Sequence, residues 1–119
     1  MINSRAVLIA SIIGIVLQVA MVVAGHTNPS VSAMFAVGGM SISLIAGVIY
    51  GYLVKGPRAL VGLIAGGATA GGVCAFIGIL VSHLMGDVPA SLLALGTISS
   101  VVTGAIGGAI GKAFGTAAA

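Results

Sequence analysis

Residues 39–55, GMSISLIAGVIYGYLVK, and residues 96–112, GTISSVVTGAIGGAIGK, decide the fold of this chain. Both stretches place a small residue at every fourth position, and they match each other at Gly, Ser, Ile and Lys positions with a constant offset of 57 residues. A fixed period of this length indicates an internal repeat. We therefore predict a single membrane domain over residues 1–119, with repeat one at about residues 1–56 and repeat two at about residues 57–119.

The composition identifies the solvent in which these repeats fold. Sixty per cent of the 119 residues are apolar, only four are Lys or Arg, one is acidic, and the mean hydropathy is +1.35. The surface of a water-soluble domain of this size does not tolerate such values, so we predict an integral membrane protein. A bilayer core about 30 Å thick requires about 20 apolar residues in a helix. Four runs have this length: residues 6–25, 31–54, 59–84 and 89–114.

Turn-forming residues separate the four apolar runs. The clusters are HTNP at residues 26–29, KGPR at 55–58 and MGDVP at 85–89, and such groups mark loops. No run alternates apolar with polar residues as a barrel strand does, and helices are the other structure that can span a bilayer. The predicted fold class is therefore an all-α integral membrane protein with four transmembrane helices, built as two tandem two-helix hairpins.

The charged residues predict the orientation in the membrane. Arg5, Lys55, Arg58 and Lys112 fall on one side of the four spans, and Asp87 falls on the other. Because basic loops stay in the cytoplasm, we expect both termini to be cytoplasmic, in a bacterial inner membrane or an equivalent membrane. Each repeat has an even number of spans, so the repeats run in the same direction and are expected to be related by a pseudo-twofold axis along the membrane normal.

Small residues predict how the helices pack. Residues four apart lie on nearly one helix face, and small residues there allow the close backbone approach on which helix association in lipid depends. Two stripes occupy matching positions in the two repeats, stripe 39–51 and stripe 96–108: Gly39, Ser43, Gly47 and Gly51, and Gly96, Ser100, Gly104 and Gly108. The last run also carries stripe 107–115, which is Gly107, Gly111 and Gly115. We predict glycine-zipper packing that gives the last helix two close neighbours and can leave one stripe for a partner.

Two histidines at equivalent positions are the candidates for a cofactor site. His26 and His83 both end the first span of their repeat, and imidazole can bind a metal, haem or chlorophyll or titrate near neutral pH. No further His, Cys or carboxylate lies at ligand spacing on either helix. We therefore predict no metal, no cofactor and no catalytic residue. Both rings are expected in the headgroup layer, with Asp87 close to His83, four residues away.

The remaining polar and aromatic side chains have structural interpretations. Gln18 is the most polar residue inside the first span, and an interhelical hydrogen bond is favoured there over a pore-lining role. Ionisable residues at mid-depth are costly and usually functional, and the four spans contain none there. Aromatic rings and long cationic side chains anchor helix ends at the headgroups, which predicts a set of interface anchors: Tyr50, Tyr52, Lys55, Arg58 and Lys112.

These observations leave two functions open. In the first, the chain is a non-catalytic structural or accessory subunit, which packs through its small-residue faces into a larger membrane complex or a homo-oligomer. Its partners are then the lipid bilayer and other membrane subunits or itself. In the second, it is a minimal channel or transporter for an ion or small solute along a helix interface. Four isolated cations form no patch for nucleic acid, and an enzyme is the least favoured interpretation.

Overall fold

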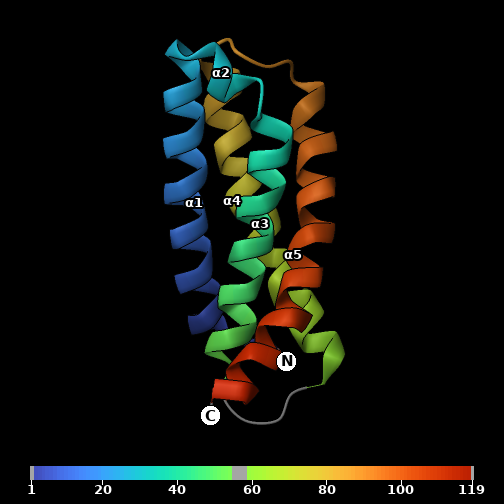
Figure 1. The fold of residues 1–119 in the computed structure, drawn as a ribbon. Coiled ribbons are helices and arrows are strands. Elements are labelled where there is room, and N and C mark those ends of the chain that lie inside the picture. The colour runs from blue at the N-terminus through green and yellow to red at the C-terminus, as the bar shows by residue number, and fades with distance from the viewer. Residues whose placement is uncertain (1, 55–58, 119) are drawn as a thin grey trace.

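The computed structural model describes residues 2–54 and 59–118, and its regular structure there is entirely helical (Figure 1). The four long helices are α1 (Ser4–Thr27), α3 (Phe35–Leu53), α4 (Leu60–Leu84) and α5 (Ser91–Ala118), and the short helix α2 (Pro29–Ser32) joins α1 to α3. All four long helices are long and apolar enough to cross a membrane. The prediction of an all-helical chain with four helices of membrane-spanning length is therefore confirmed.

The long helices form a bundle about 44 Å in length, with α3 and α4 between α1 and α5 (Figure 1). α5 packs most closely against α3 and α4, whereas α1 packs against α3 and α4 from the other side. The buried core runs along the interface of these helices, and its members are mostly small: Ala6, Ala10, Ala46, Tyr50, Val54, Leu63, Ala70 and Cys74. Small side chains in the core bring the helix axes close together.

Large apolar side chains cover the outer faces of the bundle. Leu8 and Val16 on α1 are 60% and 62% exposed, and Leu95 on α5 is 64% exposed. In water such a surface would be unstable, but a hydrocarbon solvent favours it. The pattern of small side chains inside and large ones outside is therefore the one expected for helices surrounded by lipid.

The connection between α1 and α3 differs from the predicted span limits. The second apolar run begins at residue 31, but α3 begins only at Phe35. The Asn28 side chain accepts a hydrogen bond from the Ser30 N–H at 3.0 Å, and Pro29 occupies the first turn of α2. Asn at the N-cap and Pro at the first helical position both start a new helix. These two residues therefore end α1 and form a separate helical turn before α3.

The end of α4 sets the position of the loop between α4 and α5. Gly86 has a positive φ of 82°, and its N–H donates to the His83 carbonyl at 2.9 Å. The Asp87 N–H donates to the Ser82 carbonyl at 3.0 Å. These two bonds around a left-handed Gly form a Schellman motif, which closes a helix and turns the chain away from its axis. Asp87 is therefore no longer on the helix that carries His83.

One end of the bundle, here the basic end, holds the N-terminus of α1 together with the last turns of α3 and α5. The Asn3 N–H donates to the Tyr50 hydroxyl at 3.1 Å, and Lys112 Nζ donates to the Val54 carbonyl at 3.0 Å. The opposite end holds α2 and the α4–α5 loop (Figure 1), and we call it the α2 end. The two ends differ in how tightly the helices pack.

Candidate functional site

Near the basic end, α3 and α5 meet at backbone distance through glycine. A Cβ atom added at Gly47 would overlap the Gly104 carbonyl oxygen, and one added at Gly51 would overlap the Gly108 carbonyl oxygen. Only glycine allows this approach, because the obstructing atoms belong to backbone and cannot rotate away. These four residues belong to stripe 39–51 and stripe 96–108. The structure therefore brings together the halves of the two stripes that lie nearer the basic end.

α5 uses two glycine faces on two neighbouring helices. A Cβ at Gly104 or Gly108 would overlap the carbonyl oxygen of Gly67 or Leu63 on α4. A Cβ at Gly107 or Gly111 of stripe 107–115 would overlap a carbonyl oxygen of α3, and a Cβ at Gly115 would lie 3.1 Å from the Tyr52 carbonyl oxygen. Both glycine faces of α5 therefore contact helices of the same chain, which leaves neither of them facing outward.

Toward the α2 end the same stripes have more space around them. A Cβ at Gly39 would lie 3.6 Å from Gln18 Oε1 and 3.8 Å from Met21 Cε, which are ordinary contacts. A Cβ at Gly96 would lie 2.5 Å from Cδ1 of Ile79, the flexible end of a side chain. Gly39 and Gly96 thus border a cavity instead of a backbone contact.

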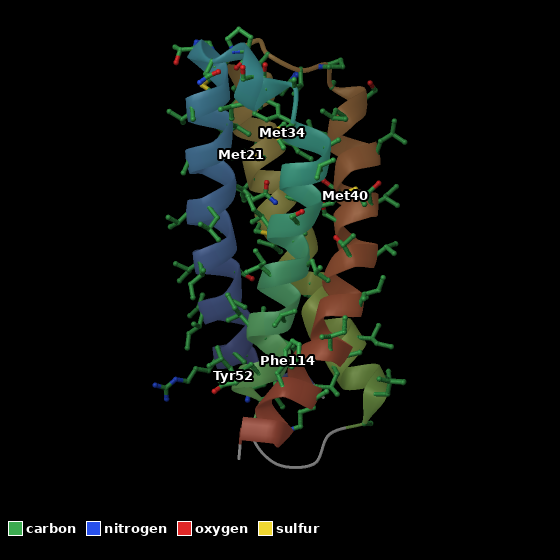
Figure 2. The ribbon with its side chains drawn as sticks, in the orientation of Figure 1. Met21, Met34, Met40, Tyr52 and Phe114 are labelled. Carbon is green, nitrogen blue, oxygen red and sulfur yellow. The ribbon has the colours of Figure 1, made fainter. Side chains whose placement is uncertain are left out.

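The cavity has a volume of about 190 Å³ and lies between the four long helices at the α2 end. Most of its lining is apolar or small, and α1, α3, α4, α5 and the α4–α5 loop all contribute: Gln18, Met21, Val22, Phe35, Ala36, Gly39, Met40, Ala75, Ile79, Ser82, Val88, Leu92, Leu95, Gly96, Ser99 and Ser100. Figure 2 shows Met40 reaching from α3 toward α5 and Met21 lying between α1 and α3. We call this hollow between the four long helices the α2-end cavity.

Gln18 is at the inner limit of this cavity and holds three helices together. Its Nε2 donates to the Gly39 carbonyl at 3.0 Å and to Ser43 Oγ at 3.3 Å. Ser43 Oγ in turn donates to the Gly71 carbonyl at 3.2 Å. A Cβ at Gly78 would lie 2.7 Å from Gln18 Cβ, so this glycine makes room for the Gln18 side chain. The hydrogen bonds agree with the expected interhelical role, and the side chain also borders the cavity.

Two polar atoms at the cavity keep unused hydrogen-bonding capacity. The Gly39 carbonyl accepts a hydrogen bond from Gln18 Nε2, so the other end of the amide, Oε1, points away from that carbonyl. Among the described residues Oε1 has no hydrogen-bond partner. Ser82 is only 1% exposed, and its Oγ also has no partner. A buried polar group without a partner costs about 1–3 kcal/mol. The sequence gives no signal for Ser82, because a lone Ser in an apolar span usually bonds its own helix.

The two histidines have different partners at the α2 end. His26 Nδ1 pairs with Asp87 Oδ2 at 2.8 Å, and the two side chains are 45% and 24% exposed. His83 Nδ1 is 2.9 Å from the Val88 carbonyl oxygen, to which it donates. Asp87 thus pairs with His26, and His83 bonds the loop backbone instead of the Asp87 side chain expected beside it, because the Schellman motif at Gly86 ends the helical spacing. Within residues 2–54 and 59–118, no three His, Cys, Asp or Glu side chains are placed to hold a metal ion.

The predicted interface anchors differ in their surroundings. Tyr52 is 51% exposed and Phe114 near it is 57% exposed, both at the basic end (Figure 2). Tyr50 is different from the expectation, since it is 1% exposed and its ring lies where a Cβ of Gly66 would be. The ring thus packs inside the bundle because a glycine on α4 leaves space for it. Lys112 bonds the end of α3, whereas Lys55 and Arg58 lie outside the described residues.

A second hollow lies on the outer surface between α4 and α5, and we call it the α4–α5 groove. Its volume is about 320 Å³, and its lining is apolar apart from two threonines: Ala68, Thr69, Gly72, Val73, Phe76, Ile77, Thr97 and Val101. Thr69 Oγ1 donates to the carbonyl of Ala65 at 2.8 Å. Thr97 Oγ1 is buried and has no hydrogen-bond partner within the described part of the chain.

No protein family, curated protein or solved structure matches this chain.

Proposed function

We propose that this chain is a small non-catalytic integral membrane protein that acts as a structural or accessory subunit and packs against a transmembrane helix of a partner subunit. The observation that carries the proposal is the α4–α5 groove. It replaces the glycine stripes as the proposed contact surface, since both glycine faces of α5 are occupied within the chain.

The groove has the features that a transmembrane helix needs for close packing. Ala68 and Gly72 are four residues apart and both line it, and small residues at this spacing allow a second helix to approach. Thr69 and Thr97 also line the groove, and hydroxyl-bearing residues at a helix interface can hydrogen-bond across to a neighbouring helix in lipid. The occupant expected here is therefore an apolar helix with small or hydroxyl-bearing residues.

The alternative function, a minimal channel or transporter, has less support from the packing. In the basic half of the bundle, the Gly104 backbone lies against the backbones of Gly47 on α3 and Gly67 on α4. Backbone contact on two sides leaves no continuous passage along the interface, so a path would require α5 to move away from α3 and α4. The accessory role requires no such movement.

The finer architecture is part of the same proposal. The contacts of Gly47 with Gly104 and of Gly51 with Gly108 pair equivalent residues of the two repeats, which supports duplicated hairpins related by a pseudo-twofold axis and joined by glycine-zipper packing. Lys112 bonding to the end of α3, with Asp87 at the α2 end, supports both termini being cytoplasmic, in a bacterial inner membrane or an equivalent membrane.

Cross-linking in native membranes tests the proposed interface. In a Cys74→Ala background, Thr69→Cys places a thiol in the groove, while Val16→Cys places one on the exposed face of α1. We expect cross-linked products at Thr69 and not at Val16, and we expect Ala68→Trp to release the chain from a larger complex. A chain that migrates alone in mild detergent, gives no product at Thr69 and carries solute flux in liposomes would instead establish the channel or transporter.

A further inference from the structure

We infer that the α2-end cavity binds a small neutral lipophilic molecule of single-ring size that carries a hydroxyl group, and that this molecule enters from the bilayer. The inference goes beyond the proposed accessory function and uses different residues. It is carried by the volume of the cavity, by two polar atoms within it and by the position of its mouth.

The volume fits a ligand with one ring and a few further atoms. An engineered apolar cavity of about 150 Å³ is large enough to bind benzene, and the α2-end cavity measures about 190 Å³. Its walls are largely aliphatic or small side chains, with Phe35 at the edge on α3. A benzene-sized body therefore fits with space for one substituent.

The polar atoms define the substituent. Gln18 Oε1 is available as an acceptor, since the amide nitrogen is already held by Gly39 and Ser43. Ser82 lines the same cavity and is 1% exposed, and its hydroxyl, which has no partner among the described residues, can donate or accept. A ligand hydroxyl can donate to Oε1 and accept from the serine hydroxyl.

The same lining selects against charged ligands. Among the described residues that line the cavity, none is Lys, Arg, His, Asp or Glu. Burial of an unpaired charge is far more costly than burial of a hydrogen-bonded hydroxyl. A neutral molecule is therefore bound, and an ion of either sign is rejected.

The mouth of the cavity lies between α3 and α5. Met40 on α3 and Leu95 on α5 both line the cavity and are 40% and 64% exposed. Met40 extends across this side toward α5 (Figure 2). Both residues lie in helices of membrane-spanning length and hydropathy, so a molecule dissolved in the bilayer reaches the mouth without crossing water.

A pair of ligands with the same shape tests the assignment. The probes are 4-fluorophenol and 4-fluorotoluene, which differ in a hydroxyl against a methyl group, and binding to the full chain in phosphatidylcholine nanodiscs is followed by ¹⁹F NMR. Because only the phenol can donate a hydrogen bond to Gln18 Oε1, we expect it to bind about tenfold more tightly than the toluene. Partition into lipid is measured with nanodiscs that lack the protein and is subtracted, and Val102→Leu, a change on an exposed face, should bind both ligands as the wild-type chain does.

Three variants locate the binding. Gly39→Leu directs a side chain into the cavity from a position with space for its Cβ, so both ligands should be lost. Gln18→Leu should abolish the preference for the phenol. Ser82→Ala, which removes no hydrogen bond among the described residues, should reduce this preference several-fold while the fold is kept. Protection of the buried Cys74 thiol reports that each variant is folded.

Two results would overturn the inference. If neither ligand binds the wild-type chain better than the Gly39→Leu variant, the cavity is filled by lipid or collapsed and is no ligand site. If both ligands bind equally, the hydroxyl is not recognised and water satisfies Gln18 and Ser82. Neither result bears on cross-linking at the α4–α5 groove, so the two proposals fail independently.

Discussion

The comparison of Gly47→Ala with Gly39→Ala tests whether a glycine of the stripe is needed for backbone contact between helices. Both residues are in stripe 39–51 on α3, eight positions apart. A Cβ at Gly47 would overlap the Gly104 carbonyl oxygen and lie 2.9 Å from the Gly104 carbonyl carbon, whereas a Cβ at Gly39 would meet nothing closer than 3.6 Å. We expect Gly47→Ala to destabilise the bundle and Gly39→Ala to leave it intact.

The expected magnitude follows from the contacts. To admit the new methyl group, α3 and α5 must separate by roughly 1 Å, and a gap of this size loses about a quarter to a half of each van der Waals contact. Overpacking of this kind costs about 1–3 kcal/mol. Replacement of Gly by Ala also favours a helix by up to about 1 kcal/mol. That gain is common to both variants and cancels when they are compared.

The buried thiol of Cys74 provides the assay without a label. It is the single cysteine of the chain and is 0% exposed, so a maleimide reacts with it only when the bundle opens. When opening and closing are fast, the labelling rate follows the equilibrium population of the open form. A loss of 1–3 kcal/mol corresponds to an increase of roughly 5- to 150-fold in the labelling rate of Gly47→Ala over Gly39→Ala.

Equal labelling rates in the two variants would refute the reasoning, because they would show that α3 and α5 are not held at glycine distance. Gly104→Ala gives an independent check, since its Cβ would overlap the Gly67 carbonyl oxygen on α4. A control on α3 must avoid residues such as Val48, whose backbone lies against Gly107 and Gly111. Ile45→Leu, at a side chain 46% exposed, is a better one.

Four further outcomes are expected. Asp87→Asn should change stability by less than about 1 kcal/mol, because the pair with His26 is partly exposed, and a Cys74 labelling rate raised more than fivefold would contradict this. Tyr50→Phe should cost about 1 kcal/mol by leaving the Asn3 N–H without its 3.1 Å acceptor, and unchanged thermal unfolding would show that water replaces it. In a Cys74→Ala background, Thr27→Cys and Ala59→Cys should react with an impermeant maleimide from opposite sides of the membrane, and reaction from one side would exclude the proposed topology. The purified protein should show no stoichiometric pigment or metal by absorbance and elemental analysis, whereas one lost in both His26→Ala and His83→Ala would make the histidines ligands.

Hydropathy and helix spacing predicted the long helices because these properties depend on neighbouring residues alone. The features that were missed depend on contacts across the bundle. Tyr50 was assigned to the headgroup layer from its place near a helix end, but Gly66 on α4 creates the space that buries it. The pairing of Asp87 with His26 depends on where α4 ends, and the signal for that was present in Gly86, a residue suited to the positive φ of a helix stop.

The α2-end cavity lies where the two stripes of small residues continue beyond the backbone contact between α3 and α5. Helices that cross at an angle diverge with distance from their closest approach, and α5 is held at the basic end by backbone contacts with α3 and α4. Toward the α2 end the growing space could be filled by large side chains. Phe35, Met40, Leu92 and Leu95 fill part of it, but small residues of α3 and α5 face it as well: Ala36, Gly39, Gly96 and Ser99. Packing alone does not require small residues where the helices have separated, whereas a cavity does, so the two halves of each stripe serve different purposes.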